Sequence, residues 1–181
     1  MTSQERIKAA INHKEPDKVP IDLGSTGVTG ISAIAYHNLK KFLGIKNGHT
    51  RIFDVTQQLA QPEDEILDHF KVDVVHLGRF FNDSEEEWYD VEVNGISAQF
   101  PSWFSPRHNE DGSMEVVHPD GMVLARMSEA ALVLDQTFWP CYDKYPEDIN
   151  GFLQALSKDP GFYLVTTPFD KLNQKGFWRK G

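Results

Sequence analysis

Three evenly spaced glycines lie between a short apolar segment and the first amphipathic helix pattern. Gly24, Gly27 and Gly30 are separated by two residues each, and Thr26 and Thr29 stand among them. Because backbone amides at the start of a helix can receive negative charge, such a turn can hold an anion. Its spacing is neither the dinucleotide fingerprint, whose first two glycines are two apart, nor a P-loop, which needs Gly-Lys-Ser/Thr. The turn is a candidate ligand site, with a plain flexible connection as the alternative.

Two basic side chains, His76 and Arg79, flank the end of a second apolar segment, Val72 to Gly78. A guanidinium at the end of a strand, as at Arg79, is suited to hold an anion, and His76 would lie beside it. The alternatives are a hydrogen-bonded core histidine and an ion pair between Arg79 and the acidic loop 83–87. No catalytic residue is assigned, and the candidate substrate contacts are Gly24, Thr26, Gly27, Thr29, His76 and Arg79.

Other polar residues carry weaker signals. Asp22 and Asp54 could orient a substrate, but capping of turns is the favoured interpretation. His108 and His118 have no cysteine near them, so no metal site is expected there. Cys141, beside aromatic residues, is expected to pack as a small apolar side chain.

The elements that position these residues alternate in type. Helices are expected behind the capping box Thr2 to Glu5, between Ile31 and a C-cap at Gly44, after Pro62, and over 146–157. Short β-branched segments without alternation predict buried parallel strands at 19–23, 72–77 and 162–167. Residues 51–60 fit a strand or a helix. This order predicts an α/β fold with parallel strand-helix-strand units.

The middle of the chain has a different pattern. Turn signals at Asn94-Gly95 and at Pro119-Asp120-Gly121 predict antiparallel hairpins.

About three parallel strands would leave a sheet with an open edge, and self-association through that edge is possible.

Composition limits the classes of function. The 181 residues carry a net charge of −9, which repels phosphate backbones, so nucleic acid is not an expected partner. No apolar run approaches the ~20 residues that span a bilayer, and the start lacks the apolar core of a secretory signal. A single cysteine allows no intrachain disulfide. These features predict a cytoplasmic protein.

The order of several segments resembles the amino-terminal half of the uroporphyrinogen decarboxylase-like superfamily. The resemblance rests on ERIKAAINHKEPDKVPIDLG, GSTGVTGI, DVTQQLAQPEDEILDHFKVDVVHLG and PEDINGFLQAL, and covers most of 4–79 and, more weakly, 120–167. It implies a partial (β/α)8 TIM barrel, with the first about three strands and their helices and an antiparallel β-hairpin insertion. In a complete barrel the glycine turn and His76 would lie on the catalytic face.

The resemblance also implies a class of chemistry. Decarboxylases of the superfamily have an arginine-containing segment after the first strand and an aspartate after the second. Here those positions hold Gly24 to Gly30 and Gly78-Arg79-Phe80-Phe81. The methyltransferase branch binds zinc through a His-x-Cys pair and a later cysteine, and exchanges a methyl group with a corrinoid. Those ligands lie in the second half of the family sequence, so no cofactor is expected within this chain.

The expected domain is the amino-terminal portion of such an enzyme over 1–170, followed by an unpatterned tail over 171–181. The expected parent activity is corrinoid-linked methyl transfer to a thiol or similar acceptor, with this chain inactive alone. A small-molecule substrate or a corrinoid protein would be the partner. The alternatives are uroporphyrinogen decarboxylation and a non-enzymatic truncated remnant.

Overall fold

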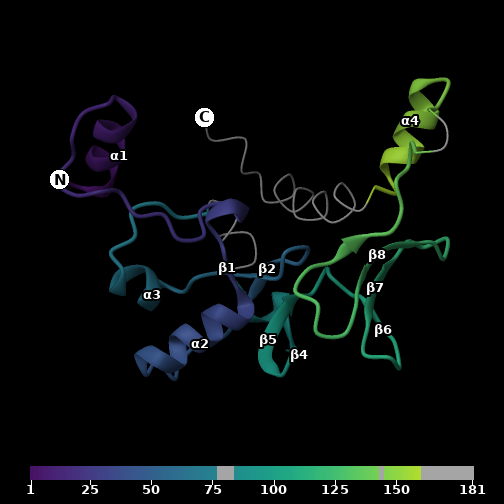
Figure 1. The fold of residues 1–181 in the computed structure, drawn as a ribbon, viewed down its shortest axis with the longest axis horizontal. Helices are drawn as coiled ribbons and strands as arrows, with labels where there is room; N and C mark the ends of the chain where they lie inside the picture. Colours follow the sequence, from purple (N-terminus) through teal and green to yellow (C-terminus); the bar gives the residue numbers. More distant parts are fainter. Residues whose placement is uncertain (77–83, 143–144, 160–181) are drawn as a thin grey trace.

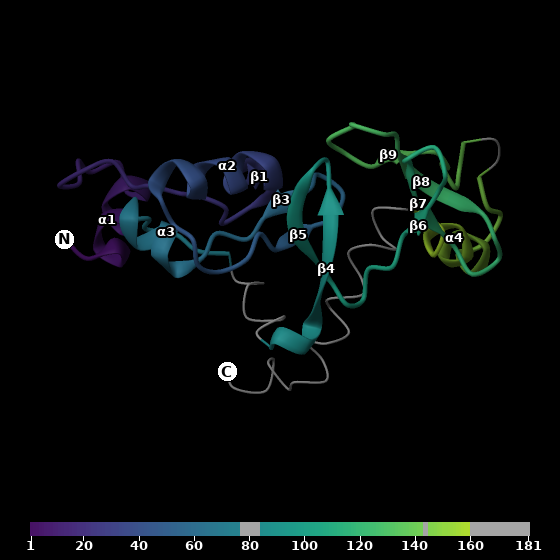
Figure 2. The same cartoon turned by 90° about the horizontal axis from the view of Figure 1, so that it is seen from below.

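The computed structural model describes residues 1–76, 84–142 and 145–159 (Figure 1). In these residues the strands form three small antiparallel sheets, accompanied by four short helices. The views in Figures 1 and 2 agree on an elongated arrangement. Helices α1 (Ser3–Ile11), α2 (Ala33–Leu43) and α3 (Asp64–His69) occupy one end, and α4 (Ile149–Leu156) occupies the other.

Local capping signals determine where the helices begin and end. The Glu5 amide donates to Thr2 Oγ1 at 3.2 Å and the Thr2 amide donates to Glu5 Oε2 at 2.8 Å, which confirms the predicted capping box of α1. Ser32 caps α2, whose C-cap Gly44 has φ of 72°, in the left-handed region that glycine adopts without strain. Asp148 caps α4 within the predicted range 146–157.

The ambiguous segment 51–60 forms two short strands joined by a turn. The sheet has the order β1–β3–β2, with β1 at Ile31–Ser32, β2 at Ile52–Asp54 and β3 at Leu59–Ala60. Ala60 pairs with Ile31 on one side and with Ile52 on the other. This sheet joins the start of α2 to the segment that leads into α3.

The middle of the molecule is a hairpin of β4 (Trp88–Val93) and β5 (Ile96–Pro101). Asn94 and Gly95 both have positive φ, 49° and 76°, as expected for the tight turn that this dipeptide favours. The 3-10 turn η3 (Glu85–Glu87) precedes the hairpin. The Asn94-Gly95 hairpin prediction is confirmed.

The far sheet has the order β6–β7–β8–β9. Its second hairpin turns through Pro119-Asp120-Gly121, as predicted. The bounds of its strands are Arg107–His108, Met114–Val117, Val123–Met127 and Asp135–Gln136.

A shared core joins the central hairpin to both of its neighbours. Ile52 from the first sheet, Phe100 from the hairpin and Leu124 from the far sheet are all fully buried in one cluster. A smaller cluster around Tyr36, Ala60 and Ile66 packs α2 against α3.

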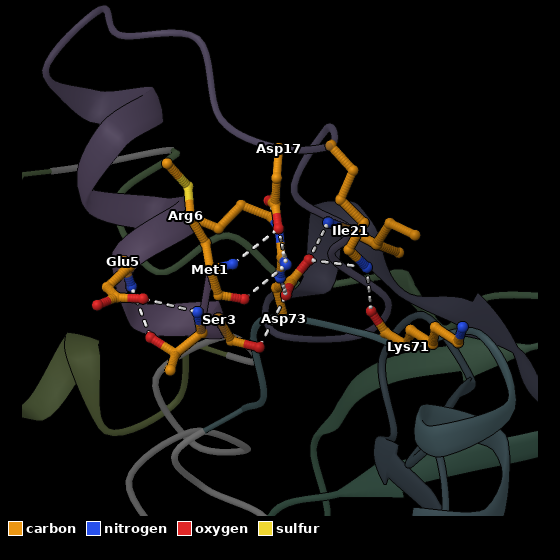
Figure 3. Close-up of polar contacts among 10 residues, drawn as sticks. Met1, Ser3, Glu5, Arg6, Asp17, Ile21, Lys71 and Asp73 are labelled. Carbon is orange, nitrogen blue, oxygen red and sulfur yellow. Dashed lines mark hydrogen bonds and ion pairs between the residues drawn. The ribbon is translucent and has the colours of Figure 1, made fainter.

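An ion-pair network fixes α1 against the chain that follows it (Figure 3). The buried Arg6 donates to both carboxylate oxygens of Asp17, at 2.7 and 3.0 Å, and forms an ion pair with Asp73. The Asp73 carboxylate, 1% exposed, also accepts from the Ser3 hydroxyl at 2.7 Å and the Ile21 amide at 3.0 Å. This N-terminal network therefore connects residues that are about seventy positions apart.

The partial (β/α)8 TIM barrel is wrong. The described strands pair antiparallel within three separate sheets, and no alternating strand and helix units of a barrel form. The predicted strands 19–23 and 72–77 meet in a single parallel bridge, Asp22 to Val74, rather than in a sheet. The physical reason is that β2 and β3 within 51–60 pair with each other and β3 also pairs with β1, while each hairpin pairs its own two strands. These strands are therefore not used to extend the parallel bridge into a sheet.

Several predictions concern residues that the structure does not describe. The predicted strand 162–167, the tail 171–181 and Arg79 lie outside the described residues. Within the ranges that the structure describes, no helix is both long enough and apolar enough to cross a membrane.

Candidate functional site

The glycine turn and His76 lie at the same edge of a short parallel contact. Besides the bridge between Asp22 and Val74, the Asp73 amide donates to the Ile21 carbonyl at 2.7 Å. Because the two segments run in the same direction, the residues that follow each of them emerge side by side. Gly24 and His76 accordingly line one cavity.

Asp22 organises the glycine turn from within. Its carboxylate accepts from the Ser25 amide at 3.0 Å and from Thr29 Oγ1 at 3.1 Å. Thr29 Oγ1 in turn accepts from the Thr26 amide at 3.2 Å. These contacts support the 3-10 turn η1 (Gly27–Thr29). The amides of Ser25 and Thr26 are thus occupied, and the negative charge held by the turn is that of Asp22 itself.

A second acidic turn packs against the first. Asp54 Oδ1 accepts from the amides of Thr56 and Gln57 at 3.0 and 2.9 Å, and Asp54 Oδ2 accepts from Gln57 Nε2 at 3.1 Å. A Cβ at Gly27 would lie 3.1 Å from Gln57 Nε2 and 3.5 Å from Asp54 Oδ2, so only a small residue fits there comfortably. Asp22 and Asp54 both cap turns, as the sequence favoured.

His76 is half-buried beside Phe53. The two ring centroids are 5.0 Å apart with an angle of 43° between the planes. Burial lowers the pKa of His76, and the charge of Asp54 partly opposes that shift. The imidazole is therefore held toward its neutral form.

The cavity that Gly24 and His76 share is small. Its volume is ≈ 10 Å³, and Phe53, Gln61, Pro62 and Leu67 contribute to its walls. A cavity of this size holds about one water molecule. The cavity is therefore too small to enclose an organic ligand.

The exposed polar residues of the two turns are Asp22, Thr26 and Gln57, which we call the acidic rim. The carboxylate of Asp22 in the rim and that of the half-buried Asp54 next to it would repel a carboxylated ligand. Hydroxyl and amide groups with a nearby negative potential suit a neutral or cationic polar ligand instead. The hydroxyls of Ser25 and Thr29 both donate to the Asp22 carboxylate, so within the turn this carboxylate acts as a structural acceptor.

The structure brings together Gly24, Thr26, Gly27, Thr29 and His76 from the predicted set. Sequence reasoning missed Gln57 and Phe53 as members of this region. A signal existed for Gln57, because an aspartate three residues earlier is typical of a capped turn. None existed for Phe53, whose contact with His76 depends on the packing of distant segments.

The other candidates lie elsewhere. His118 Nδ1 is 2.9 Å from Asp120 Oδ1 in the second hairpin turn, while His108 is exposed in β6. Cys141 is half-buried. Across the ranges 1–76, 84–142 and 145–159, no three or more His, Cys, Asp or Glu side chains gather as metal ligands would.

Comparisons with protein-family models, with curated proteins and with solved structures find no match to this chain.

Proposed function

We propose that the chain contributes the small-molecule-binding part of an enzyme of the uroporphyrinogen decarboxylase-like type, with corrinoid-linked methyl transfer to a thiol or similar acceptor as the reaction. The observation that carries the proposal is the convergence of the 22–30 turn, the 54–57 turn and His76 on one edge. These three segments belong to the sequence stretches on which the resemblance rests.

Electrostatics favours methyl transfer over decarboxylation. A tetrapyrrole substrate of a decarboxylase carries several carboxylates, which would be repelled by Asp22 of the acidic rim and by Asp54 next to it. A methyl acceptor such as a neutral thiol meets no such repulsion. In this proposal Thr26 and Gln57 bind the corrinoid methyl donor, and Gly27 allows the two turns to lie close together.

The zinc that the resemblance implies does not fit the described residues, whose His, Cys, Asp and Glu side chains form no suitable group of ligands. No step through a metal is assigned to them, and the metal ligands would come from outside these residues. We also propose a cytoplasmic location, on the grounds of the single cysteine and the acidic composition.

Equilibrium binding of methylcobalamin to the purified chain, followed by its visible absorbance after dialysis, tests this proposal. Thr26→Val removes an exposed hydroxyl of the acidic rim and should raise the Kd about fivefold, since one hydrogen bond contributes about 1 kcal/mol. Thr137→Val is the matched control, because the Thr137 hydroxyl donates to the Val123 carbonyl in the far sheet, at 2.9 Å, away from the acidic rim.

Three outcomes can be distinguished. Methylcobalamin binding that weakens in Thr26→Val and not in Thr137→Val supports the proposal. Binding of uroporphyrin in place of methylcobalamin would favour the decarboxylase alternative. A chain that binds neither compound while folded would contradict a binding role for the acidic rim.

A further inference from the structure

A second and much larger depression lies on another part of the molecule. It has a volume of ≈ 650 Å³ and is lined by the C-terminal half of α2, the loop 44–50 and the edge of the central hairpin. His37, Lys41, Lys46 and His49 line it from the helix and loop, and Asp90 and Gln99 line it from the hairpin. We call this depression the basic groove.

The charge of this region differs from that of the whole protein. Aspartate and glutamate account for 27 of the 181 residues, yet residues 23–53 contain neither. The same stretch contains Lys40, Lys41, Lys46 and Arg51. A positive surface on a protein of net charge −9 gives anions a defined place to bind, because the remaining surface repels them.

Part of this positive charge is already used within the fold. Glu63 forms an ion pair with Lys40 and accepts from the Tyr36 hydroxyl at 3.1 Å and from the His49 amide at 2.8 Å. Arg51 pairs with Glu85, which also lies 3.8 Å from His49 Nε2. Lys40 and Arg51 are therefore neutralised and serve the fold.

Lys41 and Lys46 are not neutralised in this way. Both are exposed, and neither forms an ion pair with any residue that the structure describes. His37 lies one helical turn before Lys41 on the same face of α2, so it adds a third nitrogen-bearing side chain. The groove thus retains two free positive charges on one wall.

The loop 44–50 also offers backbone hydrogen-bond donors. It turns through Gly44 and Gly48, both at positive φ. The amides of Lys46, Asn47 and Gly48 donate to no acceptor within the described part of the chain. The next amide along the loop, that of His49, already donates to the Glu63 carboxylate, which also lies against Gly48. The three amides before it can donate to a further anion, to which neighbouring lysines would add charge-assisted bonds.

The opposite wall is polar and carries a single negative group. Asp90 accepts from Gln99 Nε2 at 2.9 Å, and Ser97 lies beside them on the lining. A carboxylate with a free lone pair and a hydroxyl bind hydroxyl groups of a ligand. The groove therefore combines an anion-binding wall with a hydroxyl-binding wall.

We propose that the basic groove binds a phosphorylated, hydroxyl-bearing small molecule, with the phosphate at Lys41, Lys46 and the loop amides and the hydroxyl groups toward Asp90. This site is separate from the acidic rim, and its chemistry is opposite in sign. The proposal does not depend on the methyl-transfer proposal.

Calorimetric titration of the full chain at low salt tests the proposal with three probes: glycerol 3-phosphate, inorganic phosphate and glycerol. Glycerol 3-phosphate should bind more tightly than phosphate, and glycerol should not bind. The double variant Lys41→Ala/Lys46→Ala should raise the Kd for glycerol 3-phosphate about tenfold, since each exposed charge contact contributes up to about 1 kcal/mol. Sodium chloride should weaken binding in the wild type.

Lys8→Ala/Lys14→Ala is the matched control. Both lysines are exposed near α1, and the control changes the net charge by the same amount. The proposal is overturned if glycerol 3-phosphate gives no binding, if glycerol binds equally well, or if both double variants weaken binding to the same extent. A thermal melt of each variant verifies that it is folded, since all four side chains lie on the surface.

Discussion

Asp73 connects three parts of the chain through one buried carboxylate. It receives the Ile21 amide, the Ser3 hydroxyl and the Arg6 guanidinium, and it lies one residue before the parallel bridge at Val74. The pKa of Asp73 is lowered to about 2, first because of the Ile21 amide and then because of Ser3 and Arg6. Its ionised form therefore stabilises the folded state.

This shift predicts how stability changes in acid. Because the pKa of Asp73 is lower in the folded state than its ordinary value of 3.8, its contribution is fully present above about pH 4 and is lost as the pH falls toward about 2. Asp73→Asn keeps an acceptor for the Ile21 amide but removes the charge. The variant should be less stable than the wild type at neutral pH, and the difference should shrink between pH 4 and pH 2.

Urea unfolding at pH 2 to 7 measures this difference. Asp135→Asn is the control, because Asp135 is exposed and forms no ion pair with a described residue. A difference between wild type and Asp73→Asn that stays constant from pH 7 to pH 2 would show that the charge of Asp73 is not what stabilises the N-terminal network.

At the scale of helices and strands, two glycines allow the free-energy cost of a left-handed backbone to be measured separately from that of a steric clash. Gly44 ends α2 and Gly95 turns the central hairpin, with φ of 72° and 76°, and a Cβ at either position would meet no atom within 4 Å. Each Gly→Ala substitution should therefore destabilise the fold by about 1 kcal/mol, through the left-handed conformation and not through a clash.

Chemical denaturation of the single and double variants tests this prediction. The two effects should add, because the glycines belong to different elements and share no neighbour. Gly→Asn at the same positions should cost less than Gly→Ala, since asparagine tolerates this backbone region. Equal costs for alanine and asparagine would indicate that the loss arises from something other than the φ angle.

The same elements show what the sequence predicts well. A capping box at Thr2 and Glu5, a C-cap at Gly44 and a turn at Asn94-Gly95 each depend on residues within about four positions, and all three were confirmed. The pairing of strands, by contrast, depends on residues that are far apart in the sequence. Ala60 pairs on both of its sides, and Arg51 bridges to Gln99, forty-eight positions away.

In the candidate site too, local features were predicted from the sequence and tertiary contacts were not. The spacing of Gly24, Gly27 and Gly30 indicated a turn, and the turn exists. The hypothesis that its amides would hold a ligand did not foresee that Asp22 and Thr29 would occupy two of them. Nor did it foresee that Gly27 would pack against the Asp54 turn, because that approach is set by tertiary packing.

At the scale of the whole molecule, one core joins the first sheet, the central hairpin and the far sheet. Val55 and Ile52 near the first sheet, Phe100 in the central hairpin and Leu124 in the far sheet belong to a single buried cluster. If this cluster is the main source of stability, a cavity opened in the far sheet should weaken the first sheet as well.

Leu124→Ala tests this coupling directly. Leu124 is 0% exposed, so the substitution should lower the free energy of unfolding by roughly 2–5 kcal/mol. Leu132→Ala, at a side chain that is 56% exposed, should change it by about 0.5 kcal/mol or less. Hydrogen exchange should then accelerate in Leu124→Ala at the Gln61 amide, which donates to the Arg51 carbonyl at 2.7 Å in the first sheet. Faster exchange confined to β7 and β8 would mean that the first and far sheets unfold independently and that the central hairpin does not couple them.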